Sequence, residues 1–296
     1  MTHQPDIFQR IRKKSSQMSK AQHQIAQYIE KHPDTAAFLT TAKLAERVGV
    51  GEATIIRFST FLGFSGFTEM QHSLQEQLRK RITTVERLDL AGDIYPEEQR
   101  IAYEILNDDI ANLNQTIQML DAKVFSAAAQ KIHQADTITV VALRSSHSLG
   151  FFLTFYLQLL KKHTELITES DTMFEKLSTL TTKDLVIGIS FPRYTSRTVQ
   201  AMQYVKKRNV PTLAITDAHS SPLAGVSDLY LVAASNLPSF LDSFVAPLSL
   251  INALLTAVAR MNKTEITKHL KSMETLWEME GIYHQPDSHK RNEDRP

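Results

Sequence analysis

Hydrophobic positions along the chain follow two different periods. From residue 19 to residue 78, and again from residue 97 to residue 132, apolar residues recur every three or four positions. This spacing places them on one face of an α-helix. Between residues 137 and 232, short and nearly continuous apolar runs alternate with such helical stretches. The pattern predicts a helical N-terminal part, followed by a part in which strands and helices alternate.

The N-terminal part contains local signals for where its helices begin and end. A short amphipathic helix is predicted over Asp6–Lys14. Ser19, followed three residues later by Gln22, fits a capping box at the start of the next helix. That helix is expected to stop before Pro33, because the residue that precedes a proline avoids the helical conformation. A further helix with regular apolar spacing is predicted over Phe67–Leu78.

The stretch from Thr40 to Gly66 predicts two short helices joined by a tight turn. Ala45 lies four residues before Gly49 and ten before Ile55, which is the spacing of a helix-turn-helix. Ala45 allows a close helix crossing, and Gly49 supplies the left-handed backbone of the turn. The apolar residues expected to hold the helices together are Leu44, Val48, Val50, Ile55 and Phe58. An ordinary pair of packed helices is the alternative, and the spacing favours DNA binding.

The second helix of this motif, from Glu52 to Leu62, is the one expected to enter a DNA major groove. Arg57 either pairs with guanine, at about 1–3 kcal/mol of discrimination, or contacts only phosphate. Gly51 stands where a capping serine is usual, which is a weaker but permitted helix start. The side chains expected to face the groove are Glu52, Ala53, Thr54 and Arg57, and those expected to contact the DNA backbone are Lys43 and Ser59.

The second part of the chain has the pattern of a doubly wound α/β domain. Nearly continuous apolar strands that alternate with helices predict a parallel sheet covered on both faces. The strand-like runs are Thr137–Leu143, Leu166–Ile167, Asp184–Ser190, Pro211–Thr216 and Asp228–Val232. The helical stretches around them are Ser146–Lys161, Thr172–Leu180, Ser196–Lys207, Asp242–Met261 and Lys263–Gly281.

Between the two parts, Arg79–Pro96 loses the helical period and is expected to be a linker. Helical spacing returns over Glu97–Leu120, and Asp121 is expected to cap a helix that runs through Ile132. The predicted fold is therefore an all-α helix-turn-helix domain followed by an α/β doubly wound parallel-sheet domain. The predicted boundaries are 1–80 for the first domain, 81–120 for the linker and connecting helix, 121–281 for the second domain, and 282–296 for a disordered tail.

Composition narrows the choice of function. The chain has 296 residues, 42% of them hydrophobic, and a net charge of +1, so it can bury ordinary cores. Residues 1–81 hold 12 Lys and Arg against 7 Asp and Glu, whereas the remainder holds 21 against 25. The first domain is mildly basic and the remainder is mildly acidic, as expected if only the first domain contacts the phosphates of nucleic acid. The absence of cysteine excludes disulfides, thiolate metal sites and a thiol nucleophile.

No signal for secretion or membrane insertion is visible in the sequence. The first residues lack an apolar core behind their basic residues, so they do not form a secretory signal. The longest apolar stretch, Leu149–Leu160, is shorter than the about 20 residues that a membrane-spanning helix needs. We therefore expect a cytoplasmic protein without a membrane partner.

Hydroxyl-rich segments follow two of the predicted strands, at the edge where open α/β sheets bind ligands. Each segment carries an arginine and leads into a helix, whose N-terminus favours anions. The alternative is that the hydroxyls are only helix caps. The candidate effector-binding residues are Arg144, Ser145 and Ser146 after the first strand, and Ser190, Arg193, Tyr194, Thr195 and Ser196 after the third.

Two sets of short motifs lie in one order along the chain. The first set is Ile25–Ile29, Leu44–Ala45, Val48–Val50, Glu52–Phe58 and Leu62–Phe67. The second set is Arg144–Ser146, Asp184–Ser190, Ala214–Asp217, Ser221–Ala224 and Ala246–Leu248. Through them the chain resembles the RpiR family of bacterial regulators, with its helix-turn-helix domain and its sugar isomerase (SIS) domain. The resemblance implies a transcriptional regulator that senses a small metabolite, commonly a phosphosugar.

Both candidate loops depart from the phosphosugar pattern of that family. The first loop usually has glycines where Ala142 and Arg144 stand. The second usually reads Ser-x-Ser-Gly-x-Thr, whereas here Pro192 and Arg193 replace the inner Ser-Gly. Either the guanidinium groups now bind the anion, which suits a carboxylate or a differently placed phosphate, or the pocket is partly closed. We expect a small anionic metabolite that is not necessarily a sugar phosphate.

The resemblance also implies more than one copy of the chain on a double-stranded DNA operator. In such families one helix per monomer reads half a site, so a homodimer or homotetramer is expected. The apolar stretches Phe151–Leu160 and Phe244–Val258 either provide the contact between copies or are plain core.

A phosphosugar isomerase is the main alternative function, because a bare SIS domain can be an enzyme. Isomerisation needs a general base, and the nearby candidates are His147, Glu169, Asp171 and Glu175. A DNA-binding domain makes catalysis unnecessary to explain the fold, so we predict no catalytic residue, metal or cofactor. A DNA-binding protein whose second domain only dimerises is the third possibility. A ligand that changes operator affinity would distinguish a sensor from it.

Overall fold

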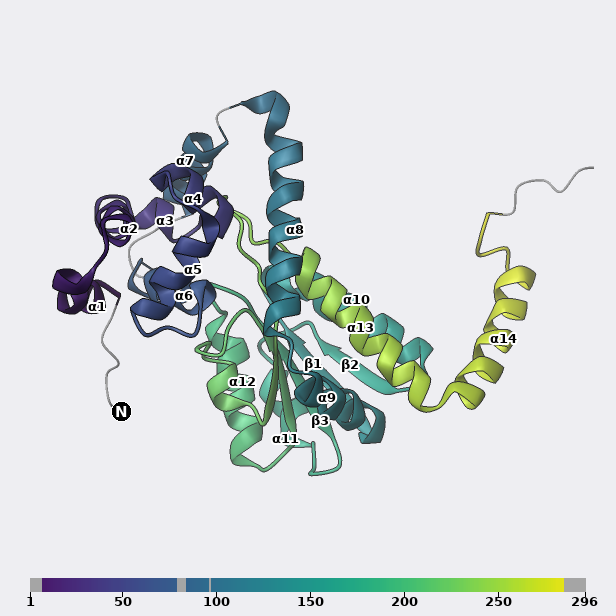
Figure 1. Cartoon of the computed structure of the whole chain (residues 1–296). Helices are drawn as coiled ribbons and strands as arrows, with labels where there is room; N and C mark the ends of the chain where they lie inside the picture. The colour runs from purple at the N-terminus through teal and green to yellow at the C-terminus, as the bar shows by residue number, and fades with distance from the viewer. Residues whose placement is uncertain (1–6, 79–83, 96, 285–296) are drawn as a thin grey trace, which may run out of the picture.

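The computed structural model describes residues 7–78, 84–95 and 97–284. A cluster of short helices lies on one side, and an open sheet with helices on both faces lies on the other (Figure 1). The long helix α8 runs between them, and the last helix, α14, projects away from the body (Figure 1). The fold class predicted from the sequence, a helical domain followed by a doubly wound α/β domain, is confirmed.

The helical domain is built from short helices around one apolar core. Its elements are α1 (Ile7–Lys14), η1 (Ser15–Gln17), α2 (Lys20–Lys31), α3 (Pro33–Ala36), α4 (Thr41–Val48), α5 (Glu52–Phe61) and α6 (Phe67–Leu78). The capping box at the start of α2 is confirmed. The Gln22 amide donates to Oγ of Ser19 at 3.3 Å, and the Ser19 amide donates to the Gln22 side chain at 2.8 Å.

The turn between α4 and α5 has the geometry of a helix-turn-helix. Gly49 has a φ of +78°, so the left-handed backbone required by the turn falls on the residue that adopts it without strain. The Gly49 amide donates to the carbonyl of Ala45 at 2.9 Å and closes α4. Leu44, Ile55 and Phe58 are fully or almost fully buried between the two helices. These packed side chains fix the position of α5 on the domain.

The segment expected to be a linker contains a helix, α7 (Thr84–Ile94), followed by η2 (Glu98–Arg100). Its last residues, Ile94 and Tyr95, are buried in the core of the helical domain. The apolar period failed to reveal α7 because Val85 and Leu88 face solvent whereas the charged Arg87 is buried. Residues 79–83 and 96, which belong to the same expected linker, lie outside the described residues.

The α/β domain contains one parallel sheet of five strands within the described residues. The strands are β1 (Thr137–Ala142), β2 (His163–Ile167), β3 (Leu185–Ile189), β4 (Thr212–Thr216) and β5 (Leu229–Val232), in the order β2-β1-β3-β4-β5. Ile138 pairs with Leu185 and Val141 with Gly188, which sets the register of the two central strands. In this order the chain reverses its winding direction at β1 and β3, and ligands of such sheets bind at that point.

Helices cover both faces of the sheet. One face packs against α9 (Ala122–Gln134), α10 (His147–Leu159) and α13 (Val245–Met261), and the other against α11 (Met173–Ser178) and α12 (Ser196–Lys207). The short turns η3 (Arg144–Ser146) and η4 (Ala224–Val226) lie in loops after β1 and β4. A Cβ on Gly188 would lie 2.6 Å from Sδ of Met202, so glycine lets α12 approach β3 closely.

Helix α8 (Ile101–Met119) has an unusual distribution of side chains. A polar stripe formed by Asp108, Asn112 and Thr116 is buried, whereas Ile110 and Ile117 are 54% and 69% exposed. The buried stripe binds the loop after β5: the Asn112 amide group donates to the carbonyl of Asn236 at 2.6 Å. The helix therefore holds the α/β domain through polar contacts and leaves apolar residues uncovered.

The chain ends, within the described residues, in α14 (Lys263–Met279). In the described part of the chain, no individual helix is both long and apolar enough to cross a membrane, and α13 and α14 together reach that length and apolar character only as a pair bent by 105°. The part of the expected disordered tail beyond residue 284 lies outside the described residues.

Candidate functional site

The residues expected to face DNA lie at the start of α5. Glu52, Ala53 and Arg57 are exposed, and Thr54 is half-buried. Nη2 of Arg57 donates to Oγ1 of Thr54 at 3.3 Å, so the guanidinium lies along the helix surface. Gly51 precedes the helix in an extended conformation and makes no side-chain cap. The first turn of α5 therefore presents its backbone amides and these side chains on the surface.

Ser59 is not on the DNA-facing surface, and the expectation that it contacts the DNA backbone is wrong. Its side chain is fully buried, and its hydroxyl donates to the carbonyl of Ile55 at 3.0 Å and contacts the sulfur of Met70 at 3.3 Å. Because Ser59 follows Ile55 by one helical turn, it shares the inner face of α5. Its hydroxyl makes its hydrogen bond with the backbone of the preceding turn of the same helix.

Lys43 is also engaged inside the molecule rather than held out for DNA. Its Nζ lies 2.9 Å from Oδ2 of Asp108 and 3.3 Å from Oε2 of Glu104, both on α8. It also lies 4.1 Å from the centre of the Tyr95 ring. The acidic side chains of α8 therefore hold this lysine, and in this structure it contacts α8 in place of the phosphate expected from the sequence.

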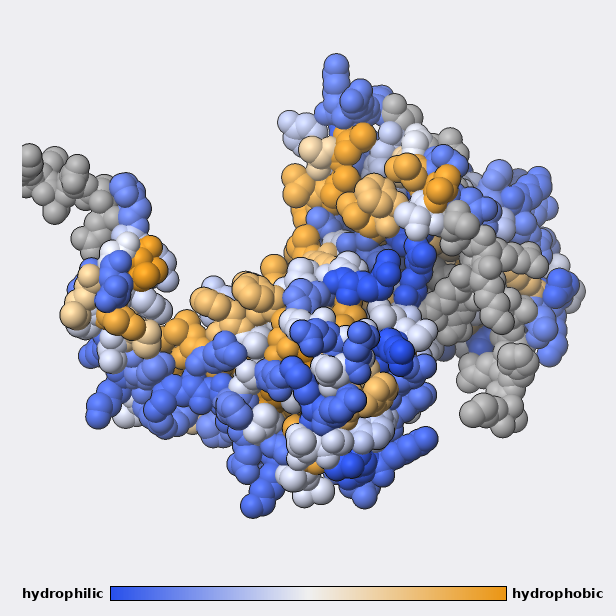
Figure 2. All heavy atoms as spheres, turned by 180° about the vertical axis from the view of Figure 1, so that it is seen from behind, coloured by the Kyte–Doolittle hydropathy of each residue, from blue (hydrophilic) through white to orange (hydrophobic). Residues whose placement is uncertain are grey.

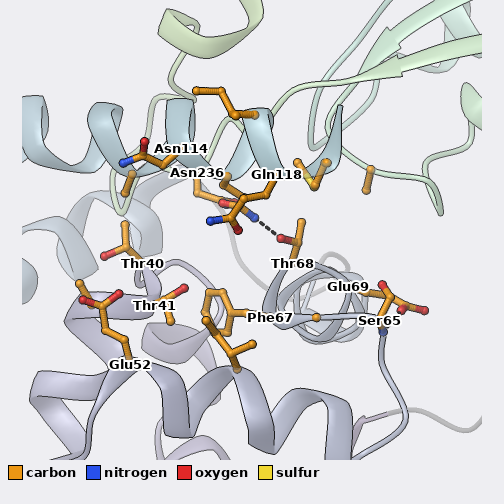
Figure 3. A pocket seen from close by; sticks show the side chains of 18 of the residues that line it. Thr40, Thr41, Glu52, Ser65, Phe67, Thr68, Glu69, Asn114, Gln118 and Asn236 are labelled. Atoms are coloured by element: carbon orange, nitrogen blue, oxygen red, sulfur yellow. Dashed lines mark hydrogen bonds between the residues drawn. The ribbon is translucent and has the colours of Figure 1, made fainter. Parts of the chain in front are cut away.

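A cleft of about 950 Å³ separates the start of α5 from α8 (Figure 3). Glu52 and Ile56 line it from α5, whereas Ala53 and Arg57 do not. The α8 side contributes amide side chains, among them Asn114 and Gln118, and an equal number of apolar ones (Figure 3). A DNA major groove receives a recognition helix between its two walls, and on this side of α5 the residues of α8 stand in the way. The part of α5 that is open to DNA is therefore the side that carries Ala53 and Arg57.

The candidate effector loops meet at the carboxyl ends of β1 and β3, where the winding direction of the sheet reverses. Arg144, in the loop after β1, has a φ of +57°, and Arg193, in the loop after β3, has a φ of +64°. This left-handed region favours glycine, and both positions are among those where the family pattern has glycine. The backbone shape of a glycine-rich anion loop is therefore kept, at a cost in strain, by two exposed arginines.

The hydroxyls of the second loop mainly hold the loop in shape. Oγ of the buried Ser190 accepts a hydrogen bond from the Thr195 amide at 3.2 Å. The Tyr194 hydroxyl donates to Oδ1 of Asp217 at 2.7 Å. Thr195 precedes α12, and Ser196 is exposed at its first position. The structure thus brings Arg193, Tyr194, Thr195 and Ser196 together at the start of one helix.

The first loop supplies fewer groups. Arg144 and Ser145 are exposed, whereas Ser146 is buried at the start of α10. The Ser145 carbonyl accepts a hydrogen bond from Ser148 at 2.9 Å. Arg144 and Ser145 are therefore the accessible groups of this loop.

Sequence reasoning missed three residues beside the second loop, namely Thr84, Arg87 and Asp242. Nη1 of Arg193 donates to Oγ1 of Thr84 on α7 at 2.5 Å. Nη2 of Arg87 lies 3.0 Å from Oδ1 of Asp242. Burial raises the pKa of Asp242, and Arg87 opposes that rise without cancelling it. Arg87 and Asp242 are 155 residues apart, so no local pattern pointed to their contact.

The candidate bases of the isomerase alternative do not form a catalytic pair. Glu169, Asp171 and Glu175 are exposed, and His147 is half-buried at the start of α10. Glu169 accepts a hydrogen bond from Thr172, and Asp171 accepts one from Ser170, each at 3.3 Å. Among the described residues, no group of three His, Asp or Glu side chains is placed to hold a metal ion.

Family models match both parts of the chain. A helix-turn-helix domain of the rpiR family matches residues 6–81, and a SIS domain matches residues 131–257. A relative described as an uncharacterized helix-turn-helix-type transcriptional regulator, from Caldanaerobacter subterraneus, is 27% identical over 285 residues. These cover 94% of this chain and 99% of the relative.

The solved structures that are similar to this chain include the following two. The sugar isomerase domain of an RpiR transcription factor from Sphaerobacter thermophilus is 32% identical, with a TM-score of 0.58, over 60% of this chain and 99% of that domain. The Vibrio vulnificus NanR protein, solved in complex with ManNAc-6P, is 21% identical, with a TM-score of 0.56, over 91% of this chain and 97% of NanR. At that identity the second likeness shows the fold alone.

Proposed function

Because this chain belongs to the RpiR family of helix-turn-helix transcriptional regulators, we propose that its α/β domain binds a small anionic metabolite that changes its affinity for an operator. The observation that carries the proposal is the pair of arginines, Arg144 and Arg193, held in left-handed conformations at the carboxyl ends of β1 and β3. Strain of this kind persists where function requires the loop shape. The two cations flank the point of the sheet where ligands bind.

The chemistry of the loops favours an anion with a planar or tetrahedral oxyanion head. A guanidinium presents parallel N–H donors that match carboxylate and phosphate oxygens. The N-termini of α10 and α12 add the positive ends of two helix dipoles on the same edge of the sheet. Because NanR is complexed with ManNAc-6P, sugar phosphates are one class to test, and carboxylated metabolites are the other.

The proposed DNA contact is made by α5. Arg57 and Ala53 lie on the side of the helix that is open, and the Gly51–Glu52 turn leaves the first amides of α5 uncapped by any side chain. Arg57 reads guanine or anchors phosphate. One α5 per chain reads half an operator, so two chains are required for a full site.

The proposed contact between copies uses the apolar side chains that the fold leaves exposed. Phe151 and Phe155 on α10 are 61% and 51% exposed, although Leu153 and Leu157 of the same helix are buried. Apolar surface gathers along the hollow edge between α8 and α14 (Figure 2). The second expected stretch, α13, is mostly core, since Leu250, Leu254 and Val258 on it are buried. We therefore assign the dimer contact to α8 and α10.

We propose that the protein is not an enzyme. A general base for isomerisation must reach a carbon-bound proton of the substrate inside a site that excludes water. The candidate carboxylates are exposed and bind neighbouring hydroxyls instead. Turnover of a sugar phosphate by the purified protein, lost on removal of His147, would favour the isomerase instead.

The proposal is tested by isothermal titration of the full-length protein against a panel of phosphorylated and carboxylated metabolites. Arg193→Ala and Arg144→Ala are expected to weaken binding of any hit by about tenfold or more, the effect of losing a charge-assisted hydrogen bond. Arg260→Ala, which removes an exposed arginine on α13, is the matched control. Equal affinity in all three variants would overturn the assignment of the site.

A further inference from the structure

Helix α7 attaches the helical domain to the candidate anion site at two points. At its start, Oγ1 of Thr84 accepts the hydrogen bond from Arg193. One turn later, Nη2 of Arg87 donates to the backbone oxygen of Leu241 at 2.8 Å and to Oδ1 of Asp242 at 3.0 Å. Arg193 belongs to the loop after β3, whereas Leu241 and Asp242 belong to the loop between β5 and α13. Both loops of the α/β domain are thus tied to one helix.

The same helix is anchored in the DNA-binding half of the chain. The guanidinium carbon of Arg87 lies 5.2 Å from the centre of the Phe38 ring, between α3 and α4. Ile94 and Tyr95 extend α7 into the core of the helical domain. Arg87 is 5% exposed, and its Nε has no hydrogen-bond partner among the described residues. A buried donor without a partner lowers the stability of the folded chain. Stability alone therefore does not explain why Arg87 lies at this position.

Both attachments are weak enough to exchange. The Arg87 and Asp242 side chains are only 6% and 18% exposed, so the loss of hydration offsets much of their attraction, and the pair fixes a geometry without adding much stability. The Thr84 hydroxyl is a neutral acceptor for one N–H of Arg193, whereas a phosphate or carboxylate is charged and can bind two parallel N–H groups of a guanidinium. An anion that binds Arg193 in this bidentate way through Nη1 therefore displaces Thr84 from it.

We propose that α7 is a strap that transmits occupation of the anion site to the DNA-binding domain. The proposal rests on the proposed function, because it requires an anion at Arg193. When the anion takes Arg193, Thr84 loses its partner, and the strap is held to the α/β domain by the contacts of Arg87 with Leu241 and Asp242. The helical domain then turns about the contact of Lys43 with α8. Arg87 is a positioning residue and does not touch the ligand.

The strap is tested first without any ligand. The chain has no cysteine, so Val85→Cys on α7 and Gln203→Cys on α12, both at exposed positions, accept nitroxide labels. Pulsed electron resonance then measures their separation in full-length protein diluted with unlabelled chains. We expect Arg87→Gln and Asp242→Asn to broaden or lengthen the distances, and Arg260→Gln to leave them unchanged. Unchanged distances in both variants, with wild-type circular dichroism, would overturn the strap.

The second experiment adds DNA and two probes, inorganic phosphate and ManNAc-6P. The duplex is one that the wild-type protein selects from random-sequence DNA. We expect ligand-free Arg87→Gln to bind this duplex with the affinity of the probe-saturated wild type. That affinity should differ from the affinity of the ligand-free wild type by about fivefold or more. Thr84→Val removes the competitor for Arg193 and is expected to bind the probe at least about twofold more tightly. Thr275→Val on α14, whose hydroxyl bonds within its own helix, is the control.

The two proposals fail in different ways. If no member of the metabolite panel binds, the effector function fails and the strap fails with it, and wider distances in Arg87→Gln then show only that Arg87 attaches α7 to the α/β domain. If a probe binds the wild type and Thr84→Val equally, and the distances in the wild type do not change, the effector site stands and the strap is overturned.

Discussion

Lys43 joins the helical domain to α8, and its replacement by methionine tests how the two halves are held together. The ammonium lies 2.9 Å from the carboxylate of Asp108 and 3.3 Å from that of Glu104. The Asp108 side chain is only 3% exposed. In Lys43→Met, the buried Asp108 carboxylate still accepts a hydrogen bond from the hydroxyl of Tyr95, at 2.6 Å. The variant therefore leaves a charge in the interface with less compensation than before.

The size of the effect follows from the burial of the pair. Removing one partner of a fully buried ion pair costs about 3–5 kcal/mol. Lys43 and Glu104 are partly exposed, at 18% and 23%, and Tyr95 keeps its hydrogen bond to Asp108. We therefore expect a loss of about 2–3 kcal/mol in the free energy of unfolding. For domains of this size, that corresponds to a fall of about 5–10 °C in Tm.

The assay is urea unfolding followed by circular dichroism, with Lys20→Met on the exposed start of α2 as the control. DNA affinity is measured over a range of salt concentrations in parallel. Each lost phosphate contact reduces the slope of log K against log salt by about 0.9. We expect Lys43→Met to unfold more easily and to keep the wild-type slope. Wild-type stability combined with a slope reduced by about one phosphate would refute this reasoning, because Lys43 would then contact DNA.

Three further outcomes are expected. Phe58→Ala, which empties a fully buried site between α4 and α5, should lower unfolding free energy by about 3–5 kcal/mol, measured by urea unfolding. Because burial raises the pKa of Asp242, the folded chain binds that proton more tightly, and the contribution of Asp242 to stability falls as pH rises from about 4 through its folded pKa. Asp242→Asn should remove this decline in unfolding experiments at pH 4 to 7. Phe151→Asp combined with Phe155→Asp should shift the protein to monomer in sedimentation, and a wild-type profile would contradict the assigned dimer surface.

The sequence predicted those parts of the fold that have local signals. The Ser19 capping box, the left-handed Gly49 and the buried strands appear in the structure where their patterns place them. Strand β2 was predicted only at Leu166–Ile167 but runs from His163. It lies at the edge of the sheet, and the exposed side chains of its first part interrupt the apolar run.

The sequence did not predict features that depend on contacts between distant residues. The apolar residues did not reveal α7, because Val85 and Leu88 are exposed whereas Arg87 is buried, and its partner Asp242 lies 155 residues away. The same applies to Lys43, which looked like a surface lysine until α8 placed Asp108 beside it. In both cases the partner that determines the role of a charged residue is brought close only by the folded chain.

The two candidate effector loops lie at the strand ends where the sequence predicted them, but the sequence did not predict what surrounds them. Arg144 and Arg193 stood out because they replace glycines in loops after buried strands, and both prove to have left-handed backbones. The hydroxyl of Ser190 was a candidate ligand, but it instead accepts the Thr195 amide and shapes the loop. The contact of Arg193 with Thr84 could not be foreseen, since no pattern placed a helix at that threonine.

The central claim, that an anion at the β1–β3 edge controls DNA binding, is tested most directly by measuring operator affinity with and without a metabolite that binds the wild-type protein. The account predicts a change of about 5- to 150-fold on saturation, which disappears in the double variant Arg144→Ala and Arg193→Ala. The account would be contradicted if the operator affinity did not change when the metabolite binds, or if the change persisted in the double variant.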